Sequence, residues 1–317
     1  MNRALMDREL IEAAWAADLE TAGRLLEAGA DVNAKDETEQ SAYLIATSEG
    51  PLELLELTLE HGGDVRSVDS YRGTGLIRAA ERGLADLVGR LIRAGIALDH
   101  VNRLGWTALH ESLIFAQPDR SEDYIDTVRV LVAAGADLRL ASQAEGLGPV
   151  ALARRHGLDA QAELLQRAID SPLLGRREAE EQLFVAALLG DADAAAVALR
   201  SGARVDARNG LDQTALLIAA THSRVSVARL LVALGADPDA LDHQHDTPVL
   251  VSSLTGNVRI LEILLTAGPD LTIANRHGGT AIIPASARGH VEFVRRLLRT
   301  GIDLDHANSF GWTPLLQ

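Results

Sequence analysis

The amino-acid sequence predicts an all-α solenoid, in which short helices stack side by side into an elongated core. Three observations support this prediction. Glycines recur at a spacing of 33 residues, a capping Thr or Ser follows most of them at a fixed distance, and only 3% of the 317 residues are aromatic although 47% are hydrophobic. A repeat of this length cannot bury its apolar face alone, so it must stack on its neighbours.

The glycines show the period most directly. The members of the 33-residue register are Gly29, Gly62 and Gly95, then Gly202, Gly235, Gly268 and Gly301. Seven residues after each of them stands a turn-forming Asp or Asn, at Asp36, Asp69, Asn102, Asn209, Asp242, Asn275 and Asn308. We therefore expect a tight turn at each of these positions, at the tip of an extended segment that we call a finger.

Each turn is followed by a residue that can cap a helix. Five residues after the Asp or Asn come Ser41, Thr74, Thr107, Thr214, Thr247, Thr280 and Thr313, and an apolar run follows each one. We expect a first helix of about nine residues ending near a glycine, and then a second helix that ends at the glycine of the register. Pro284 falls inside one of the first helices, near enough to its start to be tolerated.

Several segments resemble ankyrin repeats, namely Gly29-Ala-Asp-Val-Asn-Ala34, Thr107-Ala-Leu-His-Glu111, Gly235-Ala-Asp-Pro-Asp-Ala240 and Gly289-His-Val-Glu-Phe-Val294. The resemblance covers about residues 8 to 317 and gives nine repeats and a stub from Thr313 to Gln317. It implies an ankyrin-repeat α-solenoid with β-turn fingers. The family's usual His after Thr-Pro-Leu is retained only as His110, so packing should replace most of its hydrogen bonds between repeats.

The repeats divide into two blocks. Block 1 covers 8–169 and has seven extra residues, 116–122, between the two helices of its fourth repeat; block 2 covers 181–317. Between them, 170–180 lacks a regular finger, so we expect an irregular junction there. The Gly157 to Gly190 spacing is again 33 residues, so the blocks could equally stack in register as one bent superhelix.

The composition of the chain argues against binding to nucleic acids, membranes and cofactors. The chain has 45 Asp and Glu against 30 Lys and Arg, a net charge of −15, so we expect no binding to nucleic acid or to anionic membranes. It has no Cys, no long apolar run and no cofactor-binding motif, which predicts a soluble, cytoplasmic protein without a cofactor. Lys35 is the only lysine among many arginines, a composition typical of GC-rich bacterial genomes.

Histidines offer the one candidate for metal chemistry. His243 and His245 lie together at a predicted finger tip, flanked by Asp242 and Asp246. A stable site needs three or four converging ligands, and this spacing assures only two on one side of an extended finger. We expect no metal site, and a metal-dependent hydrolase at this finger is the alternative to a binding function.

The aromatic residues predict a binding surface. On the ankyrin pattern, Trp106 and Trp312 stand directly before the helix-opening Thr, Trp15 lies late in the first helix, and such positions face the concave groove. Apolar residues also recur two positions after the turn Asp or Asn, at Tyr71, Leu104, Leu211 and Phe310. At the finger tips these side chains would form a discontinuous apolar column along the groove. Together with His243 and His245, the residues expected at the interface are Trp15, Tyr71, Leu104, Trp106, Phe310 and Trp312. Packing against a neighbouring finger is the equally weighted alternative.

These observations predict a non-catalytic module that binds a partner protein through the concave groove of the solenoid. A further alternative is an interaction arm of a longer protein. The last residues enter the first helix of a repeat, which would leave a stacking face without a capping repeat, so we expect the sequence to be a fragment.

Overall fold

The computed structural model describes residues 3–172 and 174–316. Within this part of the chain the secondary structure is helical, with one isolated bridge between Val68 and Thr74 and no strand. The prediction of an all-α fold is confirmed. Contacts between Cα atoms divide the chain into two compact units, Met1–Ser171 and Pro172–Gln317, and each is described by itself.

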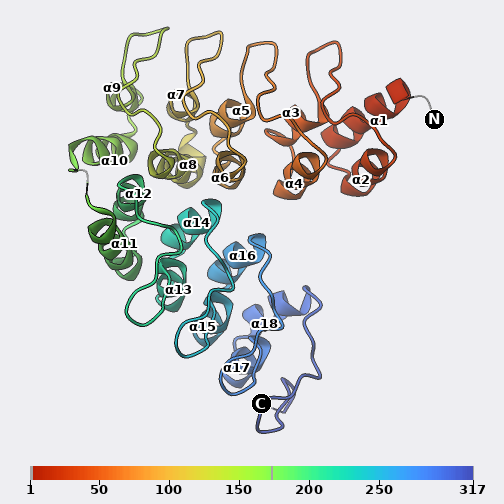
Figure 1. The fold of residues 1–317 in the computed structure, drawn as a ribbon, viewed down its shortest axis with the longest axis vertical. Helices are drawn as coiled ribbons and strands as arrows, with labels where there is room; N and C mark the ends of the chain where they lie inside the picture. Colours follow the sequence, from red (N-terminus) through yellow and green to blue (C-terminus); the bar gives the residue numbers. More distant parts are fainter. Residues whose placement is uncertain (1–2, 173, 317) are drawn as a thin grey trace. The chain divides into compact units, whose positions relative to one another are not determined.

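The first unit consists of five helix pairs. Its first helices are α1 (Arg3–Trp15), α3 (Ala42–Ala46), α5 (Gly75–Glu81), α7 (Ala108–Ile114) and α9 (Pro149–Arg155). Its second helices are α2 (Leu19–Glu27), α4 (Leu52–Glu60), α6 (Ala85–Arg93), α8 (Ser121–Ala134) and α10 (Asp159–Asp170). Within this unit the first helices form one row and the second helices another, with the finger loops projecting beside the first row (Figure 1).

The second unit has four helix pairs arranged in the same way (Figure 1). Its first helices are α11 (Arg176–Leu189), α13 (Ala215–Thr221), α15 (Pro248–Thr255) and α17 (Ile282–Ala287). Its second helices are α12 (Ala192–Arg200), α14 (Val225–Ala233), α16 (Val258–Thr266) and α18 (Val291–Leu298). α1 and α11 have 13 and 14 residues, and each is longer than the first helices of the later repeats in its unit.

Each finger turn is closed by one side-chain oxygen. At Asp69, for example, Oδ1 accepts hydrogen bonds from the backbone N–H groups of Tyr71 and Gly73, and the Asp69 N–H donates to the Gly73 carbonyl. The same pair of backbone donors reaches Oδ1 of the residues at the other turn positions, Asp36, Asn102, Asn209, Asp242, Asn275 and Asn308. The predicted turns are therefore confirmed at all seven positions.

Neighbouring fingers are linked through their backbones. The Arg103 N–H donates to the Tyr71 carbonyl at 2.8 Å, and the Ser309 N–H donates to the His277 carbonyl at 2.9 Å. The imidazoles of His100 and His306 reach carbonyls of the preceding finger in the same manner. Each finger is thus held in register by the one before it.

Helix caps follow the sequence in part. The hydroxyl oxygens of Ser41, Thr107, Thr214 and Thr247 each accept a hydrogen bond from the backbone N–H three residues later. His110 completes a capping box with Thr107, and its Nε2 reaches the Leu140 carbonyl of the next finger at 3.1 Å. The hydroxyls of Thr74 and Thr280 are buried and make no hydrogen bond within the described residues.

Close packing between repeats depends on glycine at the end of a first helix. Gly256 ends α15 with φ +69°, and a Cβ atom there would lie 2.4 Å from His290 Cγ. This close approach lets the imidazole Nε2 of His290 reach the Leu254 carbonyl at 3.2 Å. His290 of the next repeat therefore covers a carbonyl in the last turn of α15. This contact requires glycine at position 256, because any side chain there would collide with the imidazole.

Two local expectations were wrong. The first helices that follow α1 and α11 within each unit have five to eight residues instead of about nine. Thr313 is followed by a turn, not by a helix, in the described residues.

The insertion and the junction stay predictions. Residues 116–122 contain the 3₁₀ helix Pro118–Arg120 and the start of α8 at Ser121. Within 170–180, α10 ends at Asp170, α11 begins at Arg176, and the division between the two compact units falls after Ser171.

Pro284 explains one late helix start. It is the third residue of α17, whose N-cap is Ala281 and not the expected Thr280. A proline has no N–H to donate within a helix, so it is accommodated only in the first turn, where no donor is required. Starting the helix at Ile282 places Pro284 inside that turn.

We predict that trypsin cleaves first after Arg176 or Arg177. These exposed arginines open α11, directly after the short non-helical connection, and the first turn of a helix frays readily. Arg120 in the insertion should be the next site. Mass spectrometry of a limited digest measures the order, and Arg176→Gln with Arg177→Gln should slow the first cut. First cuts within the regular fingers would contradict the two-block interpretation.

Candidate functional site

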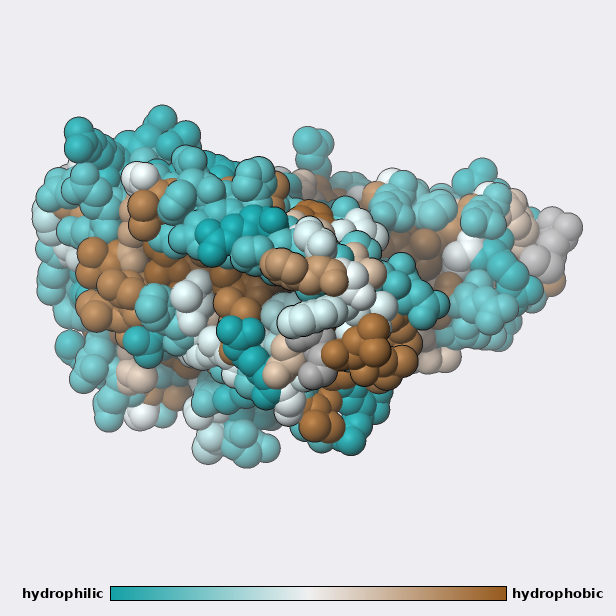
Figure 2. Space-filling model, turned by 90° about the horizontal axis from the view of Figure 1, so that it is seen from below, coloured by the Kyte–Doolittle hydropathy of each residue, from teal (hydrophilic) through white to brown (hydrophobic). Residues whose placement is uncertain are grey.

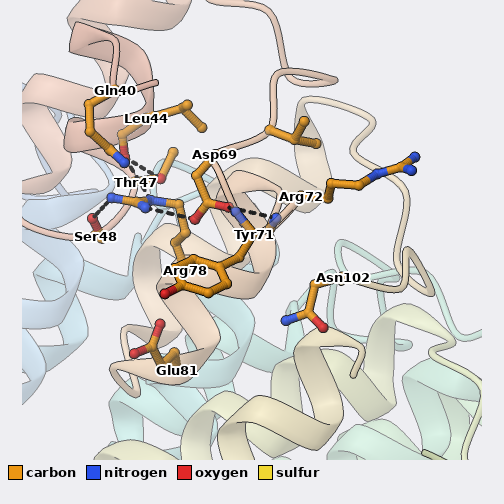
Figure 3. Close-up of polar contacts among 12 residues, drawn as sticks. Gln40, Leu44, Thr47, Ser48, Asp69, Tyr71, Arg72, Arg78, Glu81 and Asn102 are labelled. Atoms are coloured by element: carbon orange, nitrogen blue, oxygen red, sulfur yellow. Dashed lines mark hydrogen bonds and ion pairs between the residues drawn. The ribbon is translucent and has the colours of Figure 1, made fainter. Parts of the chain in front are cut away.

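A buried ion pair lies at the base of the second finger of the first unit. Arg78, on α5, donates through Nη1 to Asp69 Oδ2 at 3.0 Å, and both side chains are about nine-tenths buried. Its other nitrogens donate to the Leu44 carbonyl and to the Ser48 hydroxyl (Figure 3). Because every charged atom has a partner, the pair joins the finger to two neighbouring first helices without an unpaired buried charge.

The next repeat carries a different pair at the same positions. Glu111, on α7, is 4% exposed, and its Oε1 accepts a hydrogen bond from Asn102 Nδ2 at 2.7 Å. Its Oε2 is buried and makes no hydrogen bond within the described part of the chain. Burial and the nearby carboxylates of Glu81 and Asp69 together raise the pKa of this carboxyl to about 7, although the hydrogen bond from Asn102 lowers it.

Sequence reasoning missed these two buried groups, although the repeat contains a signal for them. Arg78 and Glu111 stand four residues after Thr74 and Thr107. At that register the other repeats that begin with Ser or Thr and have a regular finger carry Ile45, Ile218, Val251 and Pro284. A charged residue at a position that is otherwise apolar is a departure that comparison of the repeats reveals.

The residues predicted at the finger tips are exposed. The side chains of Tyr71, Leu104, Leu211 and Phe310 are between 45% and 65% exposed. In Figure 3 the Tyr71 ring lies beside Arg78, with its hydroxyl end directed toward Glu81. These four side chains are therefore accessible to solvent, and their role as an apolar column stays a prediction. The face drawn in Figure 2 shows patches of hydrophobic residues among hydrophilic ones.

The three tryptophans differ in their surroundings. Trp15 is the last residue of α1 and is 51% exposed, and Trp312 is 52% exposed. Trp106 is only half-buried, with its ring edge-on to Phe115 at 6.3 Å between centroids. The indole Nε1 of Trp106 is buried and has no hydrogen-bond partner among the described residues. Trp106 therefore combines a packing role with partial access, whereas Trp15 and Trp312 are open to solvent.

A pocket of about 450 Å³ lies along the fingers of the second unit. Phe310 and Trp312 form part of its wall, with ring centroids 6.0 Å apart, and the imidazole of His277 lies 6.1 Å from the Phe310 ring. Arg276 and Arg288 also line it. The remaining lining residues come from the turns near Asp246 and Asn275 and from helices α15 and α17.

The histidine pair does not form a ligand cluster. His243 Nδ1 is hydrogen-bonded to the Leu211 carbonyl at 2.8 Å, and His245 is exposed with φ +63° at the finger tip. Across residues 3–172 and 174–316, no three His, Asp or Glu side chains converge in a way that could hold a metal ion. The alternative of a metal-dependent hydrolase at this finger therefore has no geometric support.

In the part of the chain that the structure describes, no helix is both long enough and apolar enough to cross a bilayer.

The repeat geometry defines an ankyrin-type protein, and comparison with known proteins agrees. The family model for ankyrin repeats (3 copies) matches residues 43–142 and 183–275, so the chain belongs to the ankyrin repeat family. The number of repeats that we count in the sequence stays a prediction. Ankyrin repeats are generally non-enzymatic modules for protein–protein interaction.

Particular proteins that the chain resembles also carry ankyrin repeats. The chain is 34% identical over 142 residues to the ankyrin repeat protein YahD of Escherichia coli (strain K12), a match that covers 44% of this chain and 69% of YahD. It is 38% identical over 89 residues to human ankyrin repeat domain-containing protein 63, over 27% of this chain and 23% of that protein. A crystal structure of an ankyrin repeat domain from Acinetobacter baumannii AYE has 43% identity and a TM-score of 0.46, and covers 50% of this chain and 79% of that one.

We predict that Glu111→Gln stabilises the protein at neutral and alkaline pH. The folded protein holds the Glu111 proton more tightly than the unfolded chain, since the pKa rises from 4.5 to about 7. Stability from this group is therefore present below pH 4.5 and is lost as the pH rises toward 7. At pH 8 the variant should gain about 2 to 3 kcal/mol, and at pH 4 the two proteins should be equal.

Urea unfolding of both proteins between pH 4 and pH 8 measures this difference. Glu37→Gln is the matched control, because Glu37 is exposed on a finger of the same unit. Parallel pH profiles for wild type and Glu111→Gln would show that Glu111 is ionised without cost in the folded protein.

We predict that Trp106→Ala and Trp312→Ala differ in stability. Trp106 packs against Phe115 with its indole nitrogen buried, so its truncation should lower the free energy of unfolding by about 2 kcal/mol or more. Trp312 is half exposed, and its truncation should cost less than about 1 kcal/mol. Thermal and urea unfolding measure both. Equal losses in the free energy of unfolding would show that the greater burial of Trp106 does not contribute to stability.

Proposed function

We propose that this chain is a non-catalytic module that binds a partner protein through a groove lined by its fingers and first helices. The single observation that carries the proposal is the exposure of large apolar side chains at one register of the fingers, Tyr71 and Leu104 in the first unit and Leu211 and Phe310 in the second. Exposed aromatic and aliphatic residues in a fixed row offer contact area at low cost in side-chain entropy.

The surrounding geometry supports a rigid binding surface. Each exposed tip residue donates its N–H to the turn Asp or Asn, and the Tyr71, Leu211 and His277 carbonyls accept from the next finger. A partner would therefore meet side chains whose backbone is already fixed, which reduces the entropy lost on binding. We assign five further residues to this surface, namely Trp15, Trp106, His243, His245 and Trp312.

A protein is a better partner than a nucleic acid because the chain carries a net charge of −15, which repels a polyanion at long range. We further propose a bacterial cytoplasmic protein, on the basis of its Arg-rich composition and its similarity to bacterial relatives. Function as an arm of a longer protein agrees with the human relative, of which the match covers only 23%.

The proposal predicts that finger substitutions abolish partner binding. Proteins captured from the source cells by the wild-type chain are identified by mass spectrometry, and their affinities are then measured with purified components. Leu104→Ala, combined with Tyr71→Ala, should weaken binding about tenfold or more without loss of folding. Leu298→Ala is the matched control, because Leu298 has nearly the same exposure, 47% against 45%, but lies on α18.

A captured partner that binds the finger variant and the control equally would overturn the groove assignment. If the finger variant and the Leu298→Ala control both lose the partner, binding depends on exposed apolar surface in general and not on the fingers. Substrate turnover by the purified chain would contradict a purely binding function.

A further inference from the structure

The pocket in the second unit differs in character from the rest of this acidic chain. Its charged lining residues are Arg276, Arg288 and Asp246, with His277 beside them, so two guanidinium groups face one carboxylate. The whole chain carries −15. A locally cationic pocket on a strongly anionic protein attracts anionic groups at short range only, because the remaining charge repels them at a distance.

The pocket holds one carboxylate against two guanidinium groups. Burial raises the pKa of Asp246, and the adjacent carboxylate of Asp242 raises it further, while Arg276 and His277 lower it. Asp246 can offset one of the two arginine charges at most, so the pocket lining keeps a positive balance. Arg276 is oriented through its Nε, which donates to His277 Nε2 at 3.2 Å.

The aromatic wall lies beside these arginines. Phe310 is 65% exposed and Trp312 is 52% exposed, yet the chain has only ten aromatic residues, and three others, Tyr43, Tyr124 and Phe293, are fully buried. His277, Phe310 and Trp312 form a run of tilted rings with centroid distances of 6.1 and 6.0 Å. Such rings leave flat faces and edges available for a further aromatic or aliphatic side chain.

The fingers that carry these groups are fixed. Oδ1 of Asn275 holds the turn that bears His277, and Oδ1 of Asn308 holds the turn that bears Phe310 and Trp312. The Ser309 N–H joins the two turns through the His277 carbonyl at 2.9 Å. The backbones that carry Arg276, His277, Phe310 and Trp312 are therefore held together before any ligand binds.

We propose that this pocket binds an extended peptide segment of the partner in which an acidic residue stands next to a bulky apolar residue. The acidic side chain pairs with Arg276 and Arg288, and the apolar side chain packs on Phe310 and Trp312. This inference rests on the proposed function and specifies the chemistry of the partner. The volume of about 450 Å³ suits one or two side chains, not a folded domain.

A random twelve-residue peptide library displayed on phage tests the inference against the full chain. We expect enriched peptides to carry Asp or Glu beside Phe, Trp, Tyr or Leu. Binding of a synthetic enriched peptide, followed by fluorescence polarisation, should weaken about tenfold or more in Arg276→Glu with Arg288→Glu, and similarly in Phe310→Ala. Its affinity should also fall as salt is raised.

The matched control is Arg295→Glu with Arg299→Glu, which makes the same change in net charge on the α18 side of the unit. It should leave the affinity within about twofold of wild type, because charges beyond a Debye length are screened. Thermal melting of each variant confirms that it is folded, which the exposure of all five residues favours.

Other outcomes overturn the inference in distinguishable ways. Enriched peptides that are basic or uncharged but lose binding with Phe310→Ala would refute the acidic motif and leave groove binding intact. If the control pair of substitutions weakens peptide binding as much as the pocket pair does, the effect comes from net charge and not from the pocket. No enrichment, or tighter binding of a labelled single-stranded oligonucleotide than of any peptide, would refute a peptide ligand. Enriched peptides insensitive to Phe310→Ala and to Leu104→Ala would refute the proposed groove as well.

Discussion

One side-chain oxygen determines the shape of the regular fingers. At each of their turns, Oδ1 of an Asp or Asn accepts two backbone N–H groups that would otherwise be exposed or unpaired, as Asp69 does for Tyr71 and Gly73. In the finger between α8 and α9 the Ser142 hydroxyl takes this place and accepts from the Glu145 N–H. The turn fixes the tip, and carbonyls at the tip, such as that of Tyr71, accept from the next finger. The residue that caps the first helix stands five residues beyond the turn residue, as Thr247 does after Asp242. The exposed row of tip side chains exists because this bond recurs with the repeat.

Small residues allow the short helices behind the fingers to stack. Helices of five to nine residues are unstable alone, so their stability comes from burial against neighbours. Ala and Leu fill most of the core, and only Tyr43, Tyr124 and Phe293 are large aromatic residues that are fully buried. With so few aromatic residues needed in the core, several others are placed at the surface, where they can contact a partner.

Buried charge is matched within individual repeats. Where the first helix carries Arg78, the finger carries Asp69, and where it carries Glu111, the finger carries Asn102. An Asp in place of Asn102 would set a second carboxylate against Glu111 without a cation, which is costly in a buried site. Asn102 retains the turn-forming oxygen and adds an N–H donor, so one residue serves both the backbone and one oxygen of the Glu111 carboxyl, Oε1.

The sequence by itself determined the repeat, the turns, the caps and the family resemblance, because each depends on interactions between residues less than one repeat apart. Asp242 and Thr247 are recognisable from their spacing alone. Only the tertiary structure decided that α11 begins at Arg176, that Trp106 packs on Phe115, and that Arg276 and Phe310 line one pocket. Arg276 and Phe310 meet because neighbouring repeats stack, which brings side chains about one repeat apart together. The contact of Trp106 with Phe115 and the start of α11 depend on how the side chains pack, which the spacing of the repeat does not specify.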